Sequence, residues 1–97
     1  MSTQHSQYTS FLADKAGLAD LSPVLKALWY DGNGDWKKAH DQVDSLGGKD
    51  AARIHAYLHR KEGDLWNADY WYGRSGESRP EQTLDEEWAM LMERYYR

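Results

Sequence analysis

Four residues near the middle of the chain have the types and spacing of a metal site. His55 and His59 are four residues apart, so on a helix they would lie on one side, one turn from each other. Two neutral imidazoles placed in this way can hold one divalent metal ion, with a third ligand from Glu62 or from His40 on the preceding helix. A small metal-binding or hydrolytic protein is therefore one interpretation of the sequence.

A structural role for the same histidines is the favoured interpretation. No glutamate lies between His55 and His59, so the pattern is not the zinc-protease motif, and the chain has no cysteine to complete a structural zinc site. The two histidines would then lie at the seam between packed helices and donate to backbone or carboxylate partners beside Glu62. On this basis we predict no cofactor.

A second candidate site follows the polar edge of the helix expected over residues 64–75. Asn67, Tyr70 or Trp71, and Arg74 recur at helical spacing and combine an amide, an aromatic face and a guanidinium. Such a stripe could grip a peptide backbone or a carboxylate. Cations of the preceding helix would extend it into a basic and aromatic patch, namely Arg53, Arg60 and Lys61. The partner predicted from this patch is a protein or peptide, preferably an acidic one. In the alternative interpretation the polar groups are solvated and the last helix covers the rings.

Composition and motifs exclude several functional classes. The net charge of -4, from 12 basic and 16 acidic residues, gives no general attraction to nucleic acid or anionic lipid. The chain lacks cysteine, an apolar stretch of membrane-spanning length, and the glycine-rich phosphate cradle of nucleotide-binding proteins. No nucleophile lies beside a recognisable base, so we predict no catalytic residue and no enzyme. A cytoplasmic protein is the expectation.

Hydrophobic periodicity predicts an all-α fold. Apolar residues recur at helical spacing in each segment, while β-branched residues are few and scattered. The expected organisation is a disordered N-terminus over 1–9 and one helical domain over 10–97. This domain would contain a helix hairpin over 22–47, a second hairpin over 50–76, and an amphipathic capping helix over 83–96.

Capping residues mark the expected helix starts. Pro23 after Ser22 is a strong start signal, and Thr83 with Glu86 forms a capping box. The apolar stripe of the last helix predicts that it covers Trp66 and Tyr70. The side chains predicted to cap helices are Ser10, Ser22, Asp35, Asp50, Asp64 and Thr83.

The two hairpins carry a repeated pattern. Gly34-Asp35 recurs 29 residues later as Gly63-Asp64. In each copy glycine would end one helix, aspartate would cap the next, and an alanine would let the two helices approach closely. The residues expected to define this structure are Gly34, Asp35, Ala39, Ala56, Gly63, Asp64 and Ala68.

This pattern over residues 22–80 resembles the tetratricopeptide repeat, and the stretch 64–76 resembles the second helix of a Sel1-like repeat. The 29-residue offset is shorter than the tetratricopeptide period of 34. The resemblance implies a right-handed stack of hairpins that acts as an adaptor or scaffold for a peptide. Two copies are fewer than the usual ~3, so either the terminal helices complete the stack in a monomer or the protein forms a homodimer. The run over 55–72 is also similar to one in a group of short bacterial proteins without an assigned activity.

Overall fold

The computed structural model describes residues 6–96 as an all-helical domain. Within these residues there is no strand, which confirms the predicted all-α class. Two short 3-10 turns, Ser6–Tyr8 and Leu18–Asp20, flank the first α-helix. The α-helices are α1 Thr9–Ala13, α2 Pro23–Gly32, α3 Trp36–Val43, α4 Lys49–Glu62, α5 Leu65–Ser75 and α6 Leu84–Tyr95.

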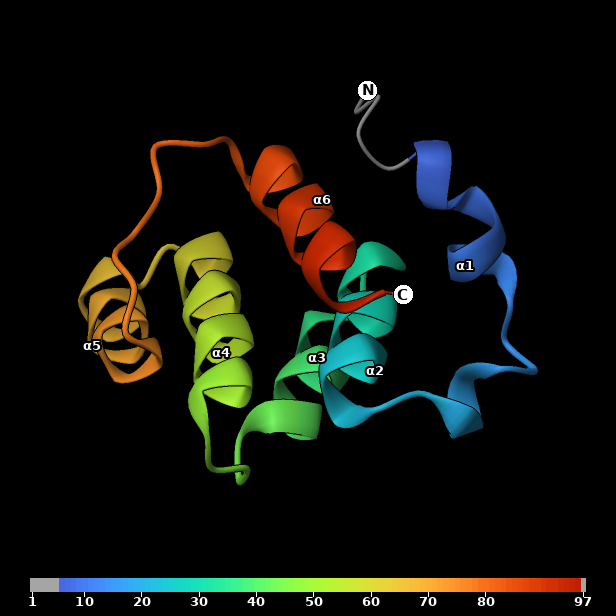
Figure 1. The fold of residues 1–97 in the computed structure, drawn as a ribbon, viewed down its shortest axis with the longest axis horizontal. Coiled ribbons are helices and arrows are strands. Elements are labelled where there is room, and N and C mark those ends of the chain that lie inside the picture. Colours follow the sequence, from blue (N-terminus) through green and yellow to red (C-terminus); the bar gives the residue numbers. More distant parts are fainter. Residues whose placement is uncertain (1–5, 97) are drawn as a thin grey trace.

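Neighbouring helices pack in pairs around α4. Helix α2 packs against α3, and α4 packs against α5. Figure 1 shows α4 between α5 and the α2–α3 pair, while α6 lies across α4 and α2. One apolar core joins α1, α2, α3, α4 and α6, and a second, smaller one lies between α4 and α5. Helix α4 thus has packing neighbours on several sides.

The two Gly-Asp steps have the same conformation. Gly34 and Gly63 take φ values of 86° and 90°, a region that favours glycine. In each step the aspartate amide donates to the carbonyl five residues earlier, at 2.8 Å for Asp35 and 3.0 Å for Asp64. Each aspartate side chain then accepts from the amide three residues later, at 3.1 Å and 3.2 Å. The predicted helix ends and caps are therefore confirmed at both positions.

Close packing of α4 on α5 depends on small residues. Ala56 and Ala68 have no exposed surface and share the smaller core with Tyr72. Ala39, which occupies in the α2–α3 pair the position that Ala68 has in the α4–α5 pair, is also fully buried. The alanines predicted to permit close helix contacts are therefore all in the interior.

Enlarging Ala68 tests this contact. Ala68→Leu should lower the free energy of unfolding by about 1–3 kcal/mol, since extra methyl groups in a filled core force neighbouring atoms apart. Chemical unfolding followed by circular dichroism measures the change. Gly73→Ala on the same helix is a control of opposite sign, because a Cβ there meets no atom within 4 Å and alanine favours the helix. A loss below about 0.5 kcal/mol for Ala68→Leu would contradict the close contact.

The last helix does not cover the aromatic rings of α5. Helix α6 packs on α2 and α4, and its Trp88 and Leu91 are fully buried. Trp66 is 81% exposed and Tyr70 is 48% exposed, so the prediction that α6 shields them is wrong. The amphipathic pattern of α6 identified its buried side, but not the helices that it packs on.

Three predictions at helix starts need correction. Helix α1 begins at Thr9, so Ser10 lies inside it. Helix α4 begins at Lys49 after Gly48, which has φ 98°, and Asp50 lies in the first turn and accepts a hydrogen bond from Tyr95. Residues 6–9 are helical where disorder was predicted, and residues 1–5 of that prediction lie outside the described residues. The caps at Ser22 and Thr83 are confirmed.

A buried ionic network ties α6 to α4 and α5. Glu87 of α6 is fully buried and lies 2.7 Å from Nη1 of both Arg53 and Arg60 on α4. The approach of Arg53 is ionic rather than a directed hydrogen bond, because Nη1 has no aligned acceptor. Tyr72 of α5 donates a 2.5 Å hydrogen bond to the same carboxylate. One side chain therefore connects three helices.

Candidate metal centre

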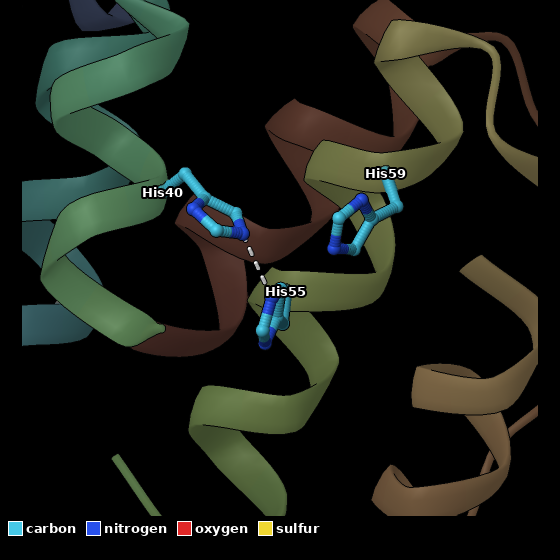
Figure 2. A group of neighbouring side chains, drawn as sticks. All are labelled: His40, His55 and His59. Atoms are coloured by element: carbon cyan, nitrogen blue, oxygen red, sulfur yellow. Dashed lines mark hydrogen bonds between the residues drawn. The ribbon is translucent and has the colours of Figure 1, made fainter. Parts of the chain in front are cut away.

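Three histidines from two helices meet on one side of α4. His40 lies on α3, and His55 and His59 lie one turn apart on α4, which packs against α3. Figure 2 shows the three rings turned toward one another. The sequence placed His55 and His59 on one helix side, and the packing of α3 adds His40, as the metal interpretation requires.

The ring nitrogens are close enough to share one ion. Nε2 of His55 lies 2.9 Å from Nε2 of His40 in a hydrogen bond. One ligand nitrogen from each of the three rings lies within 4.8 Å of the other two. In a tetrahedral zinc site with bonds of about 2.0–2.1 Å, neighbouring ligand nitrogens are about 3.3 Å apart. Small movements of these side chains would therefore reach metal-binding geometry.

Two carboxylates lie beside the cluster. Oε2 of Glu62 is 2.6 Å from Nδ1 of His59, which leaves Nε2 of His59 for a metal. A carboxylate that accepts from the second nitrogen of a ligating histidine orients the ring and increases its basicity. Oδ1 of Asp44, at the end of α3, lies 3.8 Å from Nε2 of His40 and 3.9 Å from Nε2 of His55. Glu62 is thus placed to position a ligand, and Asp44 to supply a further one.

Two tryptophans hold the rings in place. Trp36 stacks on His40 with ring centroids 4.9 Å apart, and Trp71 of α5 stacks on His55 at 4.1 Å. The Trp36 indole is itself fixed, because its Nε1 donates to the carbonyl of Leu58 at 2.7 Å. The cluster is therefore bounded by aromatic rings from α3 and α5, and this preorganisation would lower the entropic cost of binding an ion.

The environment of His55 keeps it neutral. Its side chain is 4% exposed, and burial lowers its pKa to about 4, with further lowering by His40 and His59 and an opposing effect of Asp44. A neutral imidazole has a free lone pair for a metal ion. His55 is therefore ready to bind a metal at neutral pH without first losing a proton.

The low pKa of His55 predicts a loss of stability in acid. An unfolded histidine has a pKa near 6.5, whereas the folded value is about 4. Between these values the unfolded state binds more protons, so stability decreases as the pH falls from about 7 toward 4, by up to about 3 kcal/mol. Urea unfolding with a chelator present, at pH values from 7.5 to 5, measures the slope.

A substitution isolates this contribution. His55→Gln should flatten the pH dependence over that range, because the remaining groups around the position are unchanged. His40, His59 and Asp44 are the groups whose charges act on the pKa of His55, and the substitution leaves all three in place. Equal slopes for the two proteins would contradict the neutral state of His55.

The residues predicted to bind a peptide, on the polar edge of α5, have different environments. Asn67 bonds to the capping Asp64, with Nδ2 3.4 Å from Oδ2. Tyr70 and Arg74 are exposed together, and Arg74 donates to the Tyr70 hydroxyl at 3.3 Å. Trp71 is partly buried against His55. The stripe therefore lies beside the histidine cluster and shares Trp71 with it.

The cations predicted to extend the stripe lie elsewhere. Arg60 pairs with Glu87 of α6, with its side chain 18% exposed, and Arg53 is buried in the same network. Lys61 pairs with the buried Asp31 at 2.8 Å. Internal carboxylates therefore bind all three cations, and their part in a partner-binding patch stays a prediction.

Several residues of the site were not identified from the sequence. Asp44 follows His40 by four residues, and this spacing is a usable signal for one helix side. The stacking of Trp36 and Trp71 on the histidines had no comparable signal, since it depends on how α3 and α5 pack on α4. Local spacing therefore indicates some of the residues of the site, and the others are brought to it by the packing of α3 and α5 on α4.

Within residues 6–96, no helix has the length and apolar character needed to cross a membrane. Comparisons with protein-family models, curated proteins and solved structures find no match for this chain. The geometry of the histidine cluster is therefore the strongest basis for a functional proposal.

Proposed function

We propose that this protein binds a divalent transition-metal ion through His40, His55 and His59. The observation that carries the proposal is the convergence of three ring nitrogens within 4.8 Å. Imidazole ligands suit zinc, copper, iron and nickel. A fourth ligand would come from Asp44 or from water, giving either a closed site or one with an open position. We propose metal binding without catalysis. That the protein has no catalytic residue remains a prediction from the sequence.

Metal binding would join the two helix pairs. His40 belongs to the α2–α3 pair, while His55 and His59 belong to the α4–α5 pair. The ion would replace the hydrogen bond between Nε2 of His40 and Nε2 of His55. The histidine that donates in this bond would then carry its proton on Nδ1, which frees Nε2 for the metal. Because the unfolded chain has no preformed site, the binding free energy would add to the stability of this junction.

Metal analysis and thermal melting test the proposal. Protein purified without an affinity tag should bind about one Zn²⁺ per chain in isothermal titration. At a free metal concentration of 100 times Kd, the stabilisation should be about 2.7 kcal/mol, and a chelator should reverse the higher Tm. A purely structural cluster, satisfied by the His40–His55 and His59–Glu62 contacts, would show no stoichiometric binding and no chelator-sensitive melt.

A second candidate function is a peptide-interaction module. We propose that α2–α3 and α4–α5 form two tetratricopeptide-like hairpins in a right-handed stack that presents a partner-binding surface. The matching Gly34 and Gly63 turns support the repeat, and the exposure of Trp66 at 81% supports an interaction surface. Large rings that remain exposed are common at protein interfaces. Sedimentation and a pull-down with Tyr70→Ala/Arg74→Ala against wild type test the oligomeric state and the surface.

A further inference from the structure

A small pocket lies next to the histidine cluster. It has a volume of about 200 Å³ and is bounded by the start of α4, the loop before it and α5. Trp71 lines the pocket and also stacks on His55. Lys49 and Arg74 line it as well. The pocket therefore combines an aromatic wall with two cationic side chains.

The charge of Arg74 is not neutralised within the described part of the chain. Arg74 interacts with the Tyr70 hydroxyl at 3.3 Å and lies 6.0 Å from the centroids of the Tyr70 and Trp71 rings. These contacts position the guanidinium without supplying a carboxylate. The other arginines of residues 6–96 each pair with a carboxylate, namely Arg53, Arg60, Arg79 and Arg94. Arg74 therefore differs from all of them.

Further donors at the pocket are also unused. Lys49 forms no ion pair with any residue between 6 and 96, although the protein is acidic overall. The N-cap of α4 is Gly48, which has no side chain to accept from the first amides of the helix. Nε1 of Trp71 donates to no acceptor within the described residues, whereas the indoles of Trp29, Trp36 and Trp88 all donate to backbone carbonyls. Each of these groups suits an anionic oxygen ligand.

We propose that this pocket binds a side-chain carboxylate of an acidic peptide. The guanidinium of Arg74 would bind the carboxylate, Lys49 would add a second positive charge, and Trp71 would pack against the methylene groups of a glutamate. This inference deepens the peptide-interaction proposal by naming the chemistry of the partner. It does not depend on metal binding.

An acidic peptide fits better than a nucleic acid. A nucleic-acid surface neutralises a series of phosphates along a backbone, whereas this pocket offers two cations on a chain with a net charge of -4. One or two carboxylates match that charge. Attraction over a longer range would be weak, so recognition would depend on contact inside the pocket.

Binding of a defined probe tests the proposal. The probe is a fluorescein-labelled hexaglutamate peptide with an amidated C-terminus, titrated into the full chain in the presence of a chelator. We expect saturable binding that weakens with added salt, with backbone and indole NMR shifts at Gly48, Lys49 and Trp71. Arg74→Gln and Lys49→Gln should each weaken binding by about 10-fold, as expected for the loss of a charge-assisted hydrogen bond. Both positions are exposed, and circular dichroism checks that the variants remain folded.

Two controls make the outcomes distinct. Lys37→Gln removes one positive charge on α3, from a side chain that is 78% exposed and not part of the pocket, and should change affinity by less than about twofold. A hexaglutamine peptide should not bind. Equal affinity of Arg74→Gln and wild type, NMR shifts away from the pocket, or no saturable binding would overturn the proposal. Equal binding of hexaglutamine would overturn it while supporting a peptide module, and tighter binding of single-stranded oligothymidine would overturn it in favour of nucleic acid.

Discussion

Glu87→Gln should lower the free energy of unfolding by about 3–5 kcal/mol, the cost typical of removing one partner from a buried ion pair. The carboxylate of Glu87 is fully buried and lies against Arg53, Arg60 and Tyr72. Glutamine preserves the shape but removes the negative charge. Arg53, with a side chain that is 2% exposed, would then keep a positive charge with little access to water.

Urea unfolding followed by circular dichroism measures this effect. Glu93→Gln is the matched control, because Glu93 lies on the same helix and is exposed, and it should change stability by less than about 0.5 kcal/mol. Part of the positive charge would still be balanced by Glu77, which lies 3.1 Å from Nε of Arg53. Similar small losses for the two variants would mean that Glu87 is not essential to the packing of α6.

If the histidine cluster binds metal as proposed above, removal of one of its histidines should abolish tight binding. His40→Gln is expected to weaken Zn²⁺ affinity at least about 100-fold, because it leaves two nitrogen ligands, and the three protein ligands typical even of open zinc sites would then be reached only if Asp44 also bound the ion. His40 is the suitable position, since its side chain is 18% exposed and its loss disturbs the core less than loss of the buried His55. Competition with a chromophoric chelator measures the affinity.

A graded series separates ligands from the residue that positions them. Glu62→Gln should weaken affinity by about 10–100-fold, the usual cost of losing the carboxylate behind a ligating histidine. Asp41→Asn on α3, an exposed partner of Lys37, is the control and should leave affinity unchanged. If His40→Gln, Glu62→Gln and Asp41→Asn all bound Zn²⁺ like wild type, the ion would lie at another site.

Local chemistry made much of the fold predictable. The Gly-Asp steps at 34–35 and 63–64 were recognisable because positive φ and side-chain capping act within a few residues. The capping box of Thr83 and Glu86 was readable for the same reason. The start of α4 at Gly48 is less predictable from the sequence, because the nearby Asp50 is an equally good N-cap residue by type.

Long-range packing accounts for the errors. Nothing in the local sequence indicates that Glu87 is buried between two arginines of another helix. Likewise, a stripe on α6 shows that one side is buried without identifying the helix that it contacts. The same limit applies to the histidine cluster, in which the spacing of His55 and His59 was informative and the distance to His40 depended on how α3 packs on α4.

The Gly-Asp turns, which pack consecutive helices against each other, also affect the rate of folding. Most helix contacts join neighbours along the chain, and such low contact order is typical of domains that fold in microseconds to milliseconds. The attachment of α6 is the exception, because Nε1 of Trp88 donates to the carbonyl of Leu28, 60 residues away in the sequence. Closing that loop has the largest entropic cost of the contacts described above, so docking of the final helix should be the late step of folding.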